Sequence, residues 1–128
     1  MLNMVNVGFI EEIIFRGFLF KMMEKDNVRS AIIVTSVTFG IGHIINLLNG
    51  SELISTLFQI LSAISIGYLF VIIFYKGNSL IPCIITHALF NAFSVFYVEN
   101  SLSVFINLFL IIIPLVYAWY INKNVKLN

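Results

Sequence analysis

The sequence predicts an all-α protein, a polytopic membrane helix bundle of about five transmembrane helices formed as one domain, 1–128. Hydrophobic residues make up 60% of the 128 residues and charged residues only 10%, a balance that soluble domains do not have. Apolar runs long enough to cross a bilayer alternate with short polar segments. The basic residues outside the spans all fall in every second of these segments, as they do in multi-pass membrane proteins.

The first predicted span, Leu2–Phe20, is the least suited to lipid. It contains Glu11, Glu12 and Arg16, each of which costs about 2.5–3.5 kcal/mol at the centre of a membrane helix. Each Leu, Ile, Val or Phe returns only about 0.3–0.6 kcal/mol on the same scale. We therefore expect a bundle interior or a wet cavity around these three residues, which are functional candidates for the same reason.

Four further spans follow in order and are more uniformly apolar. Pro82 falls in the first turn of the fourth span, where a missing backbone N–H does no harm. Gly40, Gly42 and Gly67 are predicted to let neighbouring helices approach closely. The four spans are Ser30–Leu48, Leu53–Tyr75, Ile81–Tyr97 and Leu102–Ile121.

The basic residues outside the spans predict an orientation. The positive-inside rule places the segments that carry them in the cytoplasm, so the N-terminus lies outside and the C-terminus inside. An outside start without a signal peptide predicts a chain that lacks N-terminal helices of a longer fold. These residues are Lys21, Lys25 and Arg29 after the first span, Lys76 after the third, and Lys123 and Lys126 after the fifth.

Charge and cysteine content exclude several classes of function. The net charge is +1 and no basic run is present, so the sequence predicts no nucleic-acid partner. Cys83 is the only cysteine, which excludes an internal disulfide and a multi-cysteine metal site. It lies in an apolar stretch without a basic neighbour, so we expect an unreactive packing residue.

The two adjacent glutamates are predicted to differ. Residues four apart share a helix face, so Glu12 can form an ion pair with Arg16 that lowers the cost of burying both. Taken alone, this pair is more typical of a structural contact than of chemistry. Glu11 lies about 100° around the helix and has no equivalent partner within its own span. It is the predicted free carboxylate and a candidate general base.

Two other spans carry polar residues at the same spacing. Phe39 precedes His43 by four residues and can brace its ring, and His87 and Asn91 can point into one cavity. Singly, these residues are also typical of packing or of hydrogen bonds between membrane helices. Their joint occurrence with Glu11 on three otherwise apolar spans predicts one polar site.

The pattern Glu11-Glu12-x-x-x-Arg16, Phe39-x-x-x-His43 and His87-x-x-x-Asn91 resembles the three ordered motifs of the CPBP intramembrane proteases. That family includes the type II CAAX prenyl endopeptidases and Abi-type proteins linked to bacteriocin self-immunity. The resemblance covers Gly8 to about Phe93. It implies an eight-helix bundle, of which the predicted spans are the last five, in a bacterial plasma membrane.

The resemblance also implies roles for the site residues. Glu11 and His43 are expected to activate a water that attacks the scissile carbonyl without a covalent intermediate. His87 and Asn91 are expected to stabilise the oxyanion, as fixed donors do in other hydrolases. No cofactor is expected, and partners are the lipid bilayer and a membrane-proximal peptide or protein substrate.

Three residues are expected to support the catalytic ones: Glu12 and Arg16 hold the first helix and tune Glu11, and Phe39 supports His43. A zinc ion held by Glu11, His43 and His87 is the alternative to the metal-free mechanism. No HExxH motif is present.

Two other functions stay open at this point. A non-catalytic bacteriocin-immunity or partner-binding membrane protein could keep the polar cluster as a structural feature. An ion or proton pathway could use Glu11 and the histidines, although it does not explain why Asn91 accompanies His87 on one face.

Overall fold

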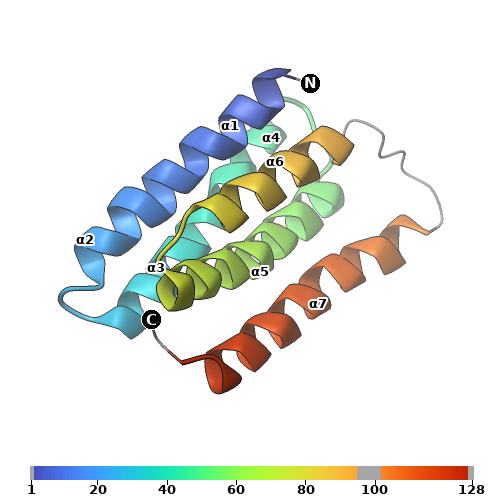
Figure 1. Cartoon of the computed structure of the whole chain (residues 1–128). Coiled ribbons are helices and arrows are strands. Elements are labelled where there is room, and N and C mark those ends of the chain that lie inside the picture. The colour runs from blue at the N-terminus through green and yellow to red at the C-terminus, as the bar shows by residue number, and fades with distance from the viewer. Residues whose placement is uncertain (1, 95–101, 127–128) are drawn as a thin grey trace.

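The computed structural model describes residues 2–94 and 102–126, and within these ranges all regular structure is helical. The helical segments form five rods, as predicted, because α1, η1 and α2 run on without a break and so do α3, η2 and α4 (Figure 1). Residues 95–97 of the predicted fourth span lie outside the described ranges. The segments are α1 (Leu2–Glu12), η1 (Ile13–Phe20), α2 (Lys21–Met23), α3 (Val28–Ile41), η2 (Gly42–Ile44), α4 (Ile45–Leu48), α5 (Leu53–Gly77), α6 (Ile81–Ser94) and α7 (Ser103–Asn124).

Two of the rods depart from α-helical geometry at their polar motifs. The segment η1 is a π-helix that begins directly after Glu12 and contains Arg16. The segment η2 is a short 3₁₀ turn that contains His43. Such local changes of helix type are frequent at functional sites, and the sequence pattern did not predict them.

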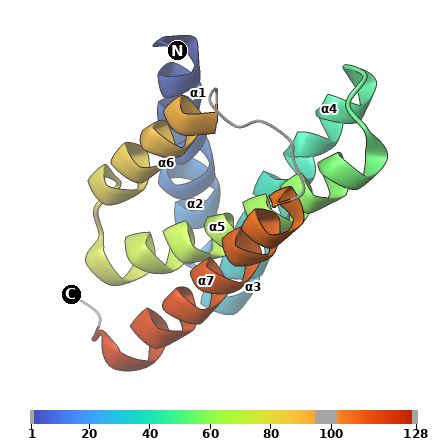
Figure 2. The ribbon, with the colours of Figure 1, turned by 90° about the vertical axis from the view of Figure 1, so that its right-hand side faces the viewer.

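The rods form two layers. Helix α5 packs against α3 on one side and α7 on the other, whereas α1 packs along α6. Figure 2 shows the α1 and α6 layer apart from the layer of α3, α5 and α7 at one end of the molecule. The segment η1 contacts both α3 and α5 and so joins the layers.

Two of the three predicted glycine contacts are found. A Cβ on Gly40 would lie 2.8 Å from the backbone oxygen of Ile60, and one on Gly67 would lie 2.9 Å from Cδ1 of Phe39. The prediction for Gly42 is wrong, since a Cβ there would meet no described atom within 4 Å. Gly42 opens the 3₁₀ turn and is exposed.

A buried apolar core joins the layers beside the polar cluster. Cys83 lies in this core, and its thiol donates a hydrogen bond to the backbone oxygen of Phe70 at 3.3 Å. The core residues are Phe20, Ala31, Phe70, Val71, Phe74 and Cys83.

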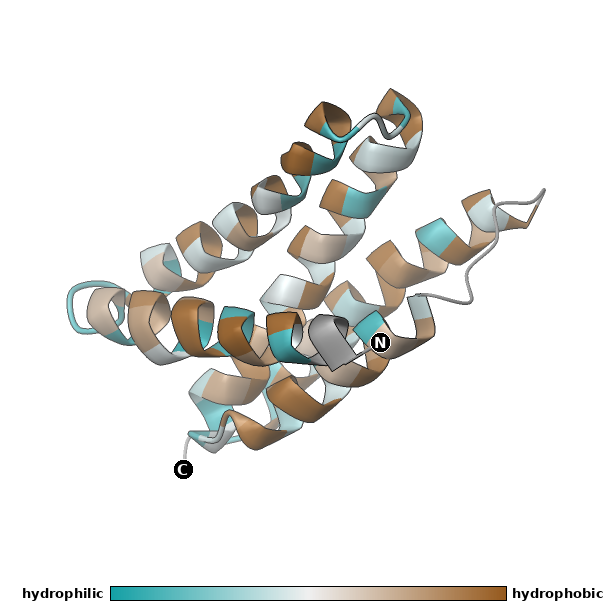
Figure 3. Cartoon of the chain, turned by 90° about the horizontal axis from the view of Figure 1, so that it is seen from above, coloured by the Kyte–Doolittle hydropathy of each residue, from teal (hydrophilic) through white to brown (hydrophobic). Residues whose placement is uncertain are grey.

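Within the described part of the chain, three rods are long and apolar enough to cross a membrane: Val28–Leu48, Leu53–Gly77 and Ser103–Asn124. Their outward faces are rich in exposed large hydrophobic side chains, the expected lipid contact of a membrane protein. Figure 3 shows hydrophobic residues along every rod, and hydrophilic ones both at the turns and at places within the rods. The ends of α2, α5 and α7, which carry basic residues, lie at one end of the bundle (Figure 1). Their orientation in a cell stays a prediction.

Candidate functional site

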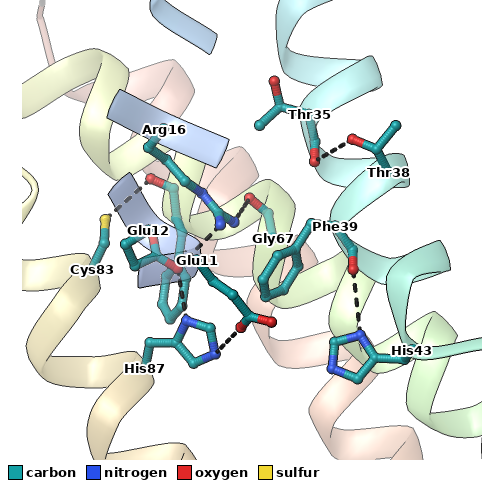
Figure 4. A network of polar contacts seen from close by, with 11 residues as sticks. Glu11, Glu12, Arg16, Thr35, Thr38, Phe39, His43, Gly67, Cys83 and His87 are labelled. Carbon is teal, nitrogen blue, oxygen red and sulfur yellow. Dashed lines mark hydrogen bonds and ion pairs between the residues drawn. The ribbon is translucent and has the colours of Figure 1, made fainter. Parts of the chain in front are cut away.

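Side chains from all three polar motifs lie near one another between the two layers, and Figure 4 shows Glu11, Glu12, Arg16, Phe39, His43 and His87. The glutamates come from the end of α1, and Arg16 comes from η1. Phe39 and His43 come from α3 and η2, and His87 comes from α6. The cluster has two parts, which differ in their access to water.

The first part, which we call the dry side, comprises Glu12, Arg16 and their buried partners. Both side chains are fully buried, and Nη1 of Arg16 donates to Oε1 of Glu12 at 3.1 Å, as predicted from their spacing. Nη2 of Arg16 donates to the backbone oxygen of Gly67 at 3.0 Å. The guanidinium carbon also lies 4.5 Å from the ring centroid of Phe39 and 5.5 Å from that of Phe70, within cation–π distance.

The dry side is not fully satisfied. Oε2 of Glu12 and Nε of Arg16 are buried and have no hydrogen-bond partner among the described residues. A buried charged group that lacks some of its hydrogen bonds depends on the partners it does have. The contacts of Arg16 with Glu12 and Gly67 are therefore expected to be important for folding.

His87 joins the dry side to the second part. Its Nδ1 lies 2.8 Å from Oε1 of Glu12, and its Nε2 lies 3.4 Å from Oε2 of Glu11. A neutral imidazole has only one N–H. The short contact of Nδ1 is a hydrogen bond with Glu12, whereas the longer contact of Nε2 with Glu11 lies outside the usual hydrogen-bond distance. The sequence placed His87 at the site but did not predict that it bridges both glutamates.

The second part, which we call the wet side, comprises Glu11, His43 and the cavity between them. The Glu11 side chain is 31% exposed, in contrast to its fully buried neighbour Glu12. In Figure 4 the Glu11 carboxylate lies between the two imidazole rings. The cavity has a volume of about 220 Å³ and is lined by Glu11, Phe15, Phe39, Gly42, His43, Ile45 and Asn46.

The hydrogen bond of His43 defines its tautomer. Nδ1 lies 3.3 Å from the backbone oxygen of Phe39, and a carbonyl oxygen can only accept. Nδ1 therefore carries the proton, which leaves Nε2 of the neutral ring as an acceptor. The Phe39 ring packs edge-on against His43 with centroids 5.7 Å apart, the bracing contact that the spacing predicted.

Asn91 faces the same part of α1 as His87. A Cβ on Gly8 would lie 3.2 Å from Nδ2 of Asn91 and 3.3 Å from Cγ of His87. The absence of a side chain at Gly8 thus lets α6 bring both residues close to α1, on one face as predicted. Neither is among the residues that line the Glu11 cavity, so their pointing into one cavity stays a prediction. Asn91 lies one helical turn beyond His87.

The alternative zinc ligands do not form a compact set. Among the described side chains, no three His, Cys, Asp or Glu residues are arranged to hold a metal ion. Glu11 and His87 are in contact, but His43 lies across the cavity (Figure 4). The metal-free mechanism stays a prediction.

Sequence reasoning missed two participants in the site. The backbone oxygen of Gly67 anchors Arg16, and the Phe70 ring contacts both Arg16 and His87. Gly67 carried a signal, since a glycine in an apolar span indicates close approach. Phe70 carried none, because phenylalanine occurs throughout the chain.

Comparison with known proteins identifies a family for the chain. The sequence model of one family, described as type II CAAX prenyl endopeptidase Rce1-like, matches residues 1–93. This range includes all three motifs. No curated protein and no solved structure matches the chain. The match covers more than half of the 128 residues, so the chain belongs to the type II CAAX prenyl endopeptidase Rce1-like family.

Proposed function

We propose that the chain is an intramembrane endopeptidase that hydrolyses a peptide bond with a water activated by Glu11 and His43. The observation that carries this proposal is that both side chains line one cavity of about 220 Å³. Glu11 is partly exposed there, and Nε2 of His43 is available as an acceptor. A water between the two groups would have two acceptors for its protons.

The proposed reaction begins with removal of a proton from this water by Glu11 or His43. The water oxygen attacks the carbonyl carbon of the peptide bond, and the carbonyl oxygen becomes an oxyanion. As the carbon–nitrogen bond breaks, the proton taken from the water passes to the leaving amine. The products are a carboxylic acid and an amine, with no covalent intermediate on the enzyme.

His87 and Asn91 are the proposed oxyanion donors. The 3.4 Å contact between Nε2 of His87 and Glu11 is longer than a usual N–H···O hydrogen bond. An oxyanion can therefore compete with Glu11 for that N–H when the ring is protonated there. One donor of this kind contributes about 2.7–4 kcal/mol to catalysis in other hydrolases.

No metal ion takes part in the proposed mechanism, and zinc on Glu11, His43 and His87 is its alternative. Dialysis against a zinc chelator distinguishes them, because metal-free hydrolysis continues at an unchanged rate. The proposed substrates are peptides at the membrane surface, and prenylated CAAX peptides are the class that the family description names.

The test uses the full protein in liposomes with randomised short peptides that carry a fluorophore and a quencher. Glu11→Gln and His43→Ala are expected to abolish the increase in fluorescence while the thermal unfolding in detergent is unchanged. Glu52→Gln is the matched control, because Glu52 lies in the exposed turn before α5. It should cleave like the wild type.

Normal cleavage by both variants would contradict the proposal. An immunity or partner-binding role predicts a different result: no peptide is cleaved, and Glu11→Gln leaves protection or partner binding intact. Cleavage of peptides in the liposomes thus distinguishes the enzymatic role from the binding role.

A further inference from the structure

A second cavity lies between α5, α6 and α7, outside the three motifs. Its volume is about 420 Å³, within the range of ligand pockets. Among the described residues, its lining combines hydroxyl and amide side chains with apolar ones and includes no charged residue. We call it the polar pocket, and it is lined by Ser55, Gln59, Ser62, Phe90, Phe93, Ser94, Asn107 and Leu110.

Ser62 supplies an independent indication that the polar pocket takes a ligand. The residue is 7% exposed, and its hydroxyl has no hydrogen-bond partner among the described residues. A buried hydroxyl without a partner costs free energy. In a bilayer this cost persists, because no bulk water reaches the group. A ligand that offers a hydrogen bond would remove it.

The polar pocket is adjacent to the wet side. Nδ2 of Asn46 donates to Oε1 of Gln59 at 2.7 Å. Asn46 lines the Glu11 cavity, and Gln59 lines the polar pocket. One hydrogen bond between α4 and α5 therefore connects a wall of each cavity. Helix α6 also contributes to both sites, since its His87 contacts the glutamates and its Phe90 lines the polar pocket.

We propose that the polar pocket binds an uncharged stretch of the peptide substrate next to the scissile bond. This inference rests on the proposed function. A peptide that enters a membrane in an extended form must find partners for its backbone N–H and C=O groups, and the neutral side chains of the pocket offer them. A lipid acyl chain cannot do this and would leave the buried Ser62 hydroxyl without a hydrogen bond.

The absence of charge among the lining residues sets a specificity. A charged substrate side chain in this pocket would have no described counter-ion and would be rejected. Phe90 and Phe93 add apolar contact, so small neutral or aromatic side chains are accepted.

The first test changes Ser62 and follows peptide cleavage in liposomes. Ser62→Ala should raise KM about two- to tenfold, the effect of one hydrogen bond, with kcat unchanged. Ser62→Thr, which keeps the hydroxyl, should restore KM. The stability of the free protein should not fall in Ser62→Ala, because the hydroxyl has no described partner to lose. A loss of stability with an unchanged KM would overturn the proposal.

The second test changes the selection of peptides. Asn107→Asp introduces a carboxylate of the same shape, so peptides with a Lys or Arg near the cleaved bond should gain at least about tenfold in relative kcat/KM. The matched control is Asn122→Asp, on an exposed part of α7 away from the pocket. It should leave the selection unchanged. Equal selection in Asn107→Asp and the wild type would overturn the proposal.

The third test measures binding without catalysis. In the Glu11→Gln background, a photo-crosslinking phenylalanine analogue at Phe93 should capture a fluorescent peptide from the library. The same analogue at Phe109, which is 62% exposed and does not line the pocket, should not. Capture of lipid at Phe93, or equal capture of peptide at both positions, would contradict the proposal that the pocket binds peptide. Peptide capture without any cleavage by the wild type would refute the proposed function and leave the pocket standing.

Discussion

Glu11 and Glu12 are neighbours in the chain, yet the wet side and the dry side place them in opposite surroundings. Glu12 is fully buried and contacts Arg16 and His87. Glu11 is 31% exposed and lines the cavity opposite His43. The difference follows from helix geometry, because adjacent side chains point about 100° apart. One carboxylate can thus hold the bundle together while the next faces water.

His87 makes the two sides depend on each other. It contacts Glu12 through Nδ1 and Glu11 through Nε2, so the buried carboxylate orients the ring that contacts the exposed one. The comparison teaches that the motif residues divide into a scaffold and a reactive surface. The predictions below test that division.

The largest effect is expected from the same substitution at the two glutamates. Glu11→Gln should lower the cleavage rate by about 10²–10⁴, the contribution of a general base, and change stability by less than about 0.5 kcal/mol. Glu12→Gln leaves Arg16 as a buried charge without its counter-ion and should cost about 3–5 kcal/mol. Peptide cleavage in liposomes and unfolding in detergent measure the two quantities. Equal losses of stability in Glu11→Gln and Glu12→Gln would contradict the division into a reactive and a structural carboxylate.

Removing both charges of the dry side should cost less than the sum of the single changes. Arg16→Met alone leaves Glu12 buried with only His87 as a partner, whereas the double variant with Glu12→Gln buries no isolated charge. We expect a coupling free energy of about 0.5–3 kcal/mol from a double-mutant cycle of unfolding. Strict additivity would show that the ion pair does not couple the two residues.

A smaller loss is expected from Gly67→Ala. The new Cβ would lie 2.9 Å from Phe39 and 3.3 Å from Nη2 of Arg16, so both must shift, at a cost of about 1–3 kcal/mol. Gly77→Ala is the control, because a Cβ there meets no described atom within 4 Å. Thermal unfolding of the two variants should differ by several degrees, and identical values would contradict the close approach.

The smallest effect is expected from Phe39→Leu, which lies between the two sides. The ring contacts Arg16, His43 and His87 at 4.5, 5.7 and 5.5 Å. Loss of such aromatic contacts costs about 0.5–1.5 kcal/mol, so kcat should fall by about tenfold or less. A loss as large as that of Glu11→Gln would assign Phe39 a more direct role than bracing.

The fold and the composition of the site were largely predictable. Long apolar runs set the five rods, and the spacing of four placed Glu12 beside Arg16 and Phe39 beside His43. These are local relations along one helix, which a period of 3.6 residues determines.

The relations between helices were not predictable in the same way. The contacts of His87 with both glutamates, the anchoring of Arg16 on Gly67 and the bond between Asn46 and Gln59 join segments far apart in the chain. They depend on how the helices are rotated against each other, which no single helical pattern contains. The π-helical segment after Glu12 belongs to the same group.

The anchor of Arg16 has a consequence for variation at this position. The acceptor is the main-chain oxygen of Gly67, and every amino acid supplies that atom. A substitution at position 67 can therefore block the approach of Arg16 to this oxygen, but it cannot remove the oxygen. Only an ester in place of the peptide amide, introduced by chemical synthesis, would weaken the acceptor itself. Natural amino-acid substitutions at position 67 can therefore change only how closely Arg16 approaches this oxygen.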